Sequence, residues 1–305
     1  MSHSSKYKII ILLITIICAK IPDFDGSKAL SYIIKQCDYG PRYPGSEGHS
    51  LFKDYLVDFV TELSDSVIVY EHEIKHPYKD HNITLFNIFA RFNPAAEERF
   101  IIMAHWDTRE IADKDPIEEN RDIPILGAND GGSGTAVLMV LSEILNSKKL
   151  VNIGVDLLFI DGEDMGRSGD IEKFCLGTRY FCESIPEPIP KYAICVDMVG
   201  DKNPSFPVEQ YSYMQAPWLV EDLWTLAIGL GHSEFKYEMG APIYDDHRAL
   251  YLHSSIPAID IIDFDFPYWH TLNDTPEHCS EYSLGIVGDV LTHYIYQQDT
   301  KFRKK

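Results

Sequence analysis

Two adjacent carboxylates, Glu163 and Asp164, follow an apolar run that extends from Leu157 to Ile160. That run is typical of a strand buried on both faces of an α/β sheet, and Gly162 predicts the turn that ends it. Open α/β sheets bind ligands beyond the carboxyl ends of their strands, which makes both acids candidates for chemistry. A lone Glu-Asp pair is more often an acidic surface turn, so the functional interpretation depends on further residues.

A third carboxylate, Asp197, interrupts another apolar strand, predicted for residues 191–199. An unpaired buried charge costs several kcal/mol, so this side chain needs a partner or a metal ion. Asp130 lies in a glycine-rich turn before an apolar helix. The turn lacks the lysine of a phosphate loop and carries an acid, so it favours a cation over a phosphate.

Zinc accepts neutral imidazole and carboxylate, and a catalytic zinc typically has three protein ligands and one open position. Asp130, Asp164 and His270 would supply such a set, and His105 with Asp107 is a further candidate group. A lone histidine is usually structural, but His270 completes a carboxylate-rich set.

The elements that must position these residues predict an α/β fold. Two amphipathic helices are expected within residues 25–64, and a sheet edge made by hairpins is expected from the strands that follow. An acidic loop covers residues 108–125, and its length indicates a functional or mobile segment. The expected strands are 67–73, 85–92, 99–104, 157–160, 191–199 and 256–262, and the expected later helices are 135–145, 217–230, 245–252 and 281–296.

Length and composition favour a single catalytic domain over residues 21–305. The chain has 305 residues and 45% hydrophobic content, enough for one large core. Its formal charge is -20, from 47 acidic and 27 basic residues. This charge disfavours nucleic acid as a partner, whereas acids around a pocket would attract the α-ammonium group of a peptide.

Residues 1–20 read as a signal peptide or membrane-proximal export segment. Lys6 and Lys8 precede an apolar run, Ile9 to Ile17, which is too short to span a bilayer comfortably. We therefore expect an exported protein, periplasmic, secreted or in a secretory pathway. Membrane contact would arise only through an N-terminal anchor such as a lipid on Cys18.

The remaining cysteines do not have paired metal-ligand spacing. They are odd in number: Cys37, Cys175, Cys182, Cys195 and Cys279. A disulfide between Cys175 and Cys182 and buried free thiols are both open interpretations.

Six short motifs occur in order and together resemble one enzyme family. They are His105-Trp106-Asp107, Gly127-Ala128-Asn129-Asp130, Asp161-Gly162-Glu163-Asp164, Asp197-Met198-Val199-Gly200, Asp245-Asp246-His247 and Trp269-His270-Thr271. This combination resembles the zinc-dependent glutaminyl cyclases of the animal type and their bacterial relatives, over roughly residues 28–298. Those enzymes share the fold of the co-catalytic zinc aminopeptidases. The resemblance implies a three-layer α/β/α architecture around a mixed, mostly parallel β-sheet.

Carried over by position, the resemblance implies a role for each candidate residue. One zinc ion per chain would be bound by Asp130, Asp164 and His270. Glu163 would be the general acid/base, in a carboxylate network with Asp197 and Asp245. The substrate pocket would include Trp269, Phe266 and Asp246.

The chain departs from the animal enzymes at three places. Asp164 is shorter than the Glu found there, and Asp260 stands where those enzymes have a His. Met165 and Gly166 offer no aromatic wall after the paired acids. Part of the substrate pocket must therefore be built differently.

The activity implied by this resemblance is cyclisation of an N-terminal glutaminyl residue of a peptide or protein to pyroglutamate, with release of ammonia. Zinc would polarise the γ-carbonyl, and Glu163 would pass the proton of the α-amine to the departing amide nitrogen. A nearby Asp197 would raise the pKa of Glu163, and zinc would lower it.

Two alternatives remain. In a zinc aminopeptidase with two co-catalytic metals, His105 and Asp197 would bind the second metal and Asp130 would bridge. Trp269, Trp106 and the paired acids at 245 and 246 favour the cyclase, because a second metal requires none of them. A catalytically inactive binding domain is disfavoured, because all the candidate positions retain residues that can bind metal or carry protons.

Overall fold

The computed structural model describes residues 20–302. The predicted export segment, including Cys18, lies outside the described residues except for Lys20. The helices are α1 (Gly26–Cys37), α2 (Glu47–Leu63), α3 (Gly132–Ser147), α4 (Leu176–Phe181), α5 (Gln210–Gln215), α6 (Pro217–Leu230), α7 (Asp246–Ser254) and α8 (Glu281–Lys301). The strands are β1 (Ser66–Lys75), β2 (Asn82–Phe92), β3 (Arg99–His105), β4 (Gly154–Ile160), β5 (Ala193–Asp197), β6 (Phe206–Val208), β7 (Phe235–Met239) and β8 (Ala258–Ile262).

Six strands form the central sheet, in the order β1-β2-β4-β3-β5-β8. Strands β4, β3, β5 and β8 run parallel, whereas β1 and β2 form an antiparallel hairpin at one edge. The hairpin edge and the mixed, mostly parallel sheet are confirmed. Strands β3, β4, β5 and β8 are buried along their whole length, which explains their continuous apolar runs.

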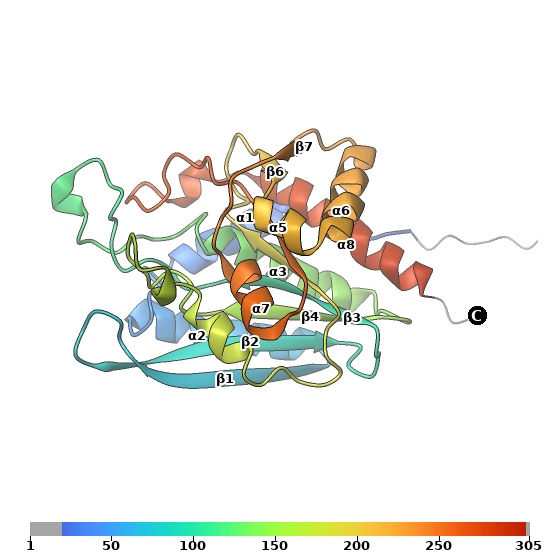
Figure 1. Ribbon diagram of the computed structural model, residues 1–305, viewed down its shortest axis with the longest axis horizontal. Helices are drawn as coiled ribbons and strands as arrows, with labels where there is room; N and C mark the ends of the chain where they lie inside the picture. Colours follow the sequence, from blue (N-terminus) through green and yellow to red (C-terminus); the bar gives the residue numbers. More distant parts are fainter. Residues whose placement is uncertain (1–19, 303–305) are drawn as a thin grey trace, which may run out of the picture.

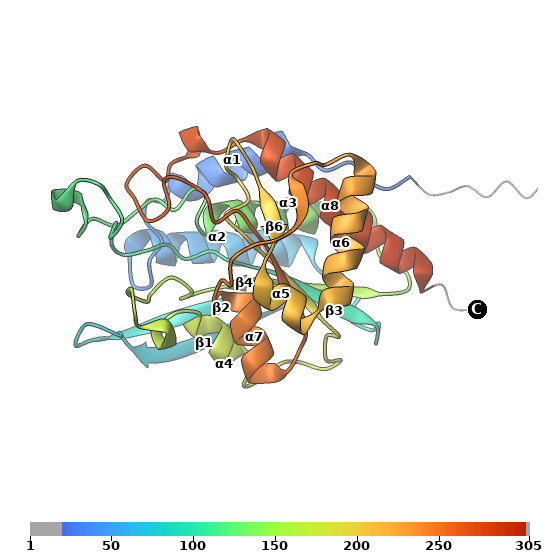
Figure 2. The same ribbon diagram turned by 45° about the horizontal axis from the view of Figure 1, so that its top comes forward.

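Helices cover both faces of the sheet, which makes the three-layer architecture visible in Figures 1 and 2. Helices α1, α2, α3, α6 and α8 share the larger apolar core with one face. Phe181 of α4 and Leu250 of α7 pack with the other face. Within residues 20–302, no helix is long and apolar enough to cross a membrane.

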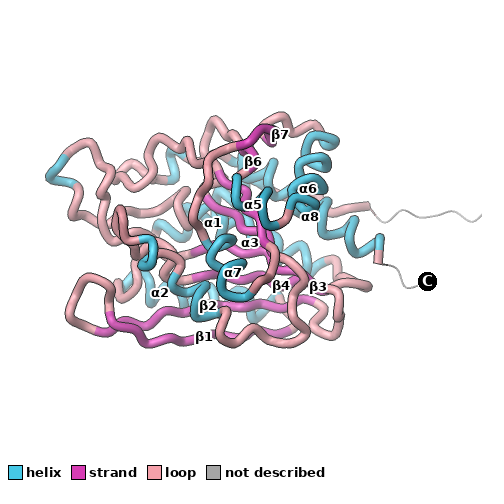
Figure 3. The backbone as a smooth tube through the Cα atoms, in the orientation of Figure 1, coloured by secondary structure: helices cyan, strands magenta, loops and turns pink. Residues whose placement is uncertain are grey.

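Helix α3 lies very close to the sheet because Gly134 has no side chain. A Cβ atom at this position would stand 2.0 Å from the carbonyl oxygen of Val196 in β5. The first turn of α3, and Asp130 just before it, are thereby held against the carboxyl ends of the central strands. Figure 3 shows the long loops gathered at this end of the molecule.

The five cysteines in the described chain are free thiols. Cys175 precedes α4 and donates to Glu163, whereas Cys182 follows α4 and faces the carbonyl of Leu250. The two sulfur atoms therefore lie at opposite ends of this short helix and contact different residues. This excludes the alternative of a disulfide between Cys175 and Cys182.

Candidate metal centre and catalytic cavity

Parallel strands deliver most of the candidate residues to one edge of the sheet. His105 ends β3, Asp197 ends β5, and Glu163 and Asp164 follow β4 after a two-residue turn. Asp130 comes from the turn before α3, not from a strand end. His270 lies in the loop after β8, with a left-handed backbone (φ 56°) that is costly for a residue with a side chain.

Two buried carboxylates fix the backbone that carries these residues. Asp107 accepts hydrogen bonds from the backbone N–H groups of Glu163 (3.1 Å) and Asp164 (3.2 Å). Asp274 accepts from the N–H groups of Asn129 (2.7 Å) and Asp130 (3.1 Å) in the same way. The sequence does not indicate Asp274 as a site residue, because the residues that it contacts lie more than 140 positions away.

Asp130, Asp164 and His270 form one group whose potential ligand atoms lie within 4.8 Å of one another. The Nε2 atom of His270 is 3.5 Å from Asp130 Oδ2 and 3.4 Å from Asp164 Oδ1. Asp130 Oδ2 and Asp164 Oδ2 are buried and have no hydrogen-bond partner among the described residues. One imidazole and two carboxylates with unsatisfied buried oxygens fit the donor set that zinc takes in catalytic sites.

His105, Asp130 and Asp197 form a second group within the same distance limit. Here the His105 Nε2 atom lies 3.1 Å from Asp197 Oδ1, within hydrogen-bond distance, and 3.3 Å from Asp130 Oδ1. Nε2 of His105 is therefore paired with Asp197, whereas its Nδ1 is buried without a hydrogen-bond partner in the described chain. Asp130 lies between the two histidines, with Oδ1 toward His105 and Oδ2 toward His270.

Protonation differs between the acids of the site. Burial raises the pKa of Glu163 well above its ordinary value, and the neighbouring charges of Asp245 and Asp164 add to this effect. Burial also acts on Asp164, but the charges of Arg109 and His270 outweigh it and lower the pKa of that carboxyl. Burial favours a neutral His270, yet Asp164 and Asp113 raise its pKa to about 9, and metal binding would have to displace that proton.

The predicted carboxylate network lies beside Glu163. Asp245 borders the cavity and forms a close group with Glu163 and Cys175. Asp246 is fully buried behind the site, where it accepts a hydrogen bond from Thr178 (2.7 Å), and it does not line the cavity. The two side chains point in different directions because Asp245 is the N-cap of α7 whereas Asp246 is the first residue of the helix.

Asp260, which replaces a histidine of the animal enzymes, is fully buried next to this network. Its Oδ2 atom is 3.6 Å from Nδ1 of His247, and neither carboxylate oxygen has a hydrogen-bond partner in the described chain. Burial, together with the charge of Asp245, raises the pKa of Asp260 well above its ordinary value. Asp260 therefore holds its proton to higher pH than an ordinary aspartic acid does.

A cavity of about 480 Å³ opens beside the group formed by Asp130, Asp164 and His270, and it has an aromatic wall. Trp269 lines it and stacks on the ring of His270, with ring centroids 3.8 Å apart. Phe264 lines the cavity and packs on Trp269 (4.9 Å between centroids). Phe266, expected in this wall, does not line the cavity; it is buried against Met198 and Ile262, which do line it.

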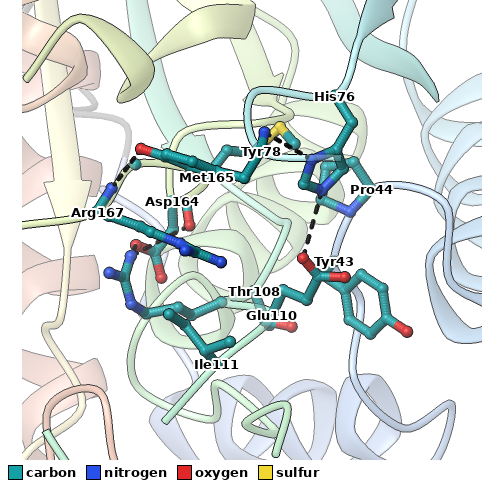
Figure 4. A pocket seen from close by; sticks show the side chains of 12 residues that line it. Tyr43, Pro44, His76, Tyr78, Thr108, Glu110, Ile111, Asp164, Met165 and Arg167 are labelled. Carbon is teal, nitrogen blue, oxygen red and sulfur yellow. Dashed lines mark hydrogen bonds and ion pairs between the residues drawn. The ribbon is translucent and has the colours of Figure 1, made fainter. Parts of the chain in front are cut away.

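The aromatic residue missing after the paired acids is supplied by Phe174. Phe174 lines the cavity, and a Cβ atom on Gly166 would lie 2.0 Å from its ring. Gly166 thus leaves the space that Phe174 fills. Met165 points to a separate pocket of about 20 Å³ on another side of Asp164, which it shares with Tyr78 and other residues (Figure 4). No sequence pattern indicates that Phe174 belongs to this wall, because an irregular loop after the paired acids returns the chain to the cavity.

Comparisons with known proteins agree with this geometry. Residues 87–295 match peptidase family M28. A glutaminyl-peptide cyclotransferase of Drosophila melanogaster is 24% identical over 265 residues, which cover 77% of this chain and 70% of that protein. The solved structure of Tannerella forsythia glutaminyl cyclase is 34% identical, with a TM-score of 0.86 and coverage of 90% of this chain and 99% of that chain. A Zn-dependent exopeptidase from Parabacteroides distasonis is 32% identical, with a TM-score of 0.87 and coverage of 91% and 99%.

Proposed function

The chain belongs to peptidase family M28, and from this premise we propose that it is a zinc-dependent glutaminyl-peptide cyclotransferase. The substrates are peptides or proteins with an N-terminal glutamine, and the products are the pyroglutamyl peptide and ammonia. One zinc ion per chain is held by Asp130, Asp164 and His270.

The observation that carries this proposal over a two-metal peptidase is the contact between His105 and Asp197. Nε2 of His105 and Oδ1 of Asp197 are hydrogen-bonded at 3.1 Å, whereas the buried carboxylate oxygens Asp130 Oδ2 and Asp164 Oδ2 have no partner in the described chain and lie at the first group. A water-activating second metal would have to displace the proton that His105 and Asp197 share in this contact. A single metal leaves it intact.

The residues around the cavity have distinct roles in this reaction. A zinc ion at the first group would supply Lewis-acid polarisation of the γ-carbonyl. The aromatic wall of Trp269, Phe264 and Phe174 holds the folded glutaminyl side chain and excludes water. Glu163 takes the proton from the attacking α-amine and returns it to the departing amide nitrogen, so that one carboxylate serves both steps. Asp197 and Asp245 line the cavity, where they would attract the α-ammonium group of an arriving peptide before it loses a proton to water and attacks as the neutral amine.

We also propose that residues 1–20 direct export, with an anchor at Cys18 as an option, and that residues 21–305 are one catalytic domain. N-terminal sequencing of the protein from its native host tests the first statement. A mature chain that begins at Met1 would contradict it.

The function is tested with two peptides that differ only in whether glutamine is N-terminal or internal. We expect ammonia release from the first peptide alone, abolished by a zinc chelator and restored by zinc. The peptide should lose the mass of ammonia but no residue, and metal analysis should give about one zinc per chain. Release of free amino acids with two zinc ions per chain would identify the aminopeptidase instead.

Glu163→Gln removes the proton carrier but keeps the size of the side chain. We expect cyclisation to fall by at least about 100-fold, the lower range of general acid–base contributions. The variant should still contain zinc. Retained activity would rule out the role assigned to Glu163.

A further inference from the structure

The loop of residues 108–125 reaches the metal group through one buried cation, Arg109. This side chain is 2% exposed. Its Nη1 atom donates to Asp164 Oδ1 at 2.5 Å and to the backbone carbonyl of Asp164 at 3.3 Å. The guanidinium therefore holds both the side chain and the backbone of a predicted metal ligand.

The opposite side of the same guanidinium holds Asp113. Nε and Nη2 of Arg109 donate to the two oxygens of Asp113, at 2.8 and 3.1 Å. Such a two-pronged arrangement fixes the planes of both groups relative to each other. Arg109 thus connects two carboxylates that lie on different loops.

Asp113 in turn faces the histidine ligand. Its Oδ1 atom is 3.2 Å from Nδ1 of His270, the ring nitrogen that faces away from Asp130 and Asp164. The neighbouring residue Lys114 donates its backbone N–H to the carbonyl of His270 at 3.1 Å. The loop therefore contacts both the ring and the strained backbone of this ligand.

These contacts make one continuous chain, Asp164–Arg109–Asp113–His270, that closes around two of the three predicted ligands. The two ligands are more than 100 positions apart and belong to loops that follow different strands. Partners of this kind orient metal ligands, and their loss typically costs 10- to 100-fold in metal affinity. They are especially needed by Asp164, whose short side chain has one oxygen committed to Arg109.

We propose that Arg109 and Asp113 are positioning residues that hold Asp164 and His270 together as metal ligands. This inference rests on the metal site of the proposed function. It assigns the acidic loop a defined task, since the loop forms part of the frame of the site.

The test compares Arg109→Ala, Arg109→Lys and Asp113→Asn with the control Glu110→Gln. Glu110 belongs to the same loop and forms ion pairs with Lys79 and with His76, the latter drawn in Figure 4. Among the described contacts, it has no hydrogen bond or ion pair with Asp164 or His270. Zinc affinity is measured on each purified full chain by competition with a chromophoric chelator, and kcat and KM are measured on a glutaminyl peptide. Thermal unfolding without metal checks that each variant is folded.

We expect Arg109→Ala to bind zinc 10- to 100-fold more weakly and Glu110→Gln to match the wild type. Arg109→Lys should recover part of the affinity, because an ammonium group keeps the charge but cannot reach both carboxylates as a planar fork. Asp113→Asn, which changes little in size, should weaken binding even where Arg109→Ala fails to fold. At saturating zinc, kcat should fall more than KM rises, because the ligands are misplaced while the aromatic wall is intact.

Two results would overturn the proposal, and they are distinguishable. Wild-type affinity in both Arg109→Ala and Asp113→Asn would refute the positioning role and leave the proposed function standing. A wild-type chain that binds no zinc would remove the metal site itself, and with it both proposals.

Discussion

Glu163 and Asp164 are neighbours in sequence but have opposite chemical surroundings. Asp164 contacts the guanidinium of Arg109, which lowers the pKa of the carboxyl and keeps it ionised against the effect of burial. Glu163 contacts a thiol and neighbouring acids, and burial raises its pKa well above the ordinary value. In the proposed reaction the two adjacent acids thereby take different roles, an ionised zinc ligand and a proton carrier, a separation that enzymes commonly achieve through environment.

Cys175 provides a prediction at this scale, because its thiol donates to Glu163 Oε1 at 3.3 Å from a left-handed backbone (φ 54°). Replacing it by alanine removes a donor from the proton carrier. We expect Cys175→Ala to lower kcat several-fold with little change in KM, and Cys175→Ser to recover part of the loss, because a hydroxyl also donates. Steady-state kinetics on a glutaminyl peptide measure both constants.

Cys182→Ala is the matched control, since Cys182 flanks the same helix but lies away from the site. It should behave as the wild type. Equal losses in Cys175→Ala, Cys175→Ser and Cys182→Ala would show that only packing of α4 matters.

Sequence alone indicated the principal polar residues because a carboxylate or imidazole beside an apolar strand is unusual in itself. The sequence did not indicate residues whose type is common in loops and whose position depends on the fold. Phe264 was passed over for Phe266, since either phenylalanine suits a loop and only the fold turns one outward. Arg109 and Asp113 were missed because an arginine in an acidic loop is ordinary until its partners are known.

At the scale of elements, Glu209 joins three segments around the cavity. Its carboxylate caps α5 by accepting from the N–H groups of Tyr211 (2.8 Å) and Ser212 (2.5 Å). It also accepts from the N–H of Ile243 (2.9 Å), in the cavity wall, and lies 3.0 Å from His247 Nε2 in α7. Burial opposes the charge, yet these hydrogen bonds, led by that of His247, lower the pKa of Glu209 to about 2.

This shift predicts how stability depends on pH. A lowered folded pKa stabilises the protein above the ordinary value of 4.5, and the contribution is lost as pH falls towards about 2. We expect Glu209→Gln to unfold up to about 3 kcal/mol more easily than the wild type at pH 7. The difference should shrink between pH 5 and 2 in urea titrations monitored by circular dichroism. A difference independent of pH would contradict the ionised state of Glu209.

The long elements were predictable and the short ones were not. Strands β3, β4, β5 and β8 and the larger helices have enough apolar periodicity to be recognised, and α6 matches its predicted bounds. Strand β7 is exposed at all but its first position, and α4 and α5 have six residues each. Such elements exist because of tertiary contacts, so local sequence gives them little signal.

At the scale of the molecule, the three proposed zinc ligands come from three parts of the chain. Asp130 precedes α3, Asp164 follows β4 and His270 follows β8. A ligand that binds only this folded arrangement stabilises it by mass action, by about 4 kcal/mol at a concentration 1,000 times Kd. We expect a chelator to lower the midpoint of thermal unfolding and added zinc to restore it.

Asp130→Ala serves as the control, because it removes one ligand. Scanning calorimetry of this variant should show a midpoint that no longer responds to zinc. A response equal to that of the wild type would mean that the stabilising ion binds elsewhere.

The α/β class followed from strands buried on both faces, but the order of the strands did not. Adjacent strands in the sheet, such as β2 and β4, are separated in sequence by β3 and α3. Their pairing depends on complementary surfaces across the whole sheet. The pattern of apolar residues within one strand does not predict which strand will be its neighbour.

Helix α3 also sets the distance between the cavity and both ends of the described chain. It begins at Gly132, next to Asp130, and its 16 residues extend for about 24 Å. Beyond its far end, the Lys148 side chain donates to the backbone of Lys20, and Ile21 and the last turns of α8 line a groove there. Figure 1 shows both ends of the described chain on this side of the molecule. A bead, electrode or sensor surface coupled at residue 20 or 302 would therefore hold the protein by the end opposite its catalytic cavity. Immobilised preparations attached in this way should keep their access to peptides.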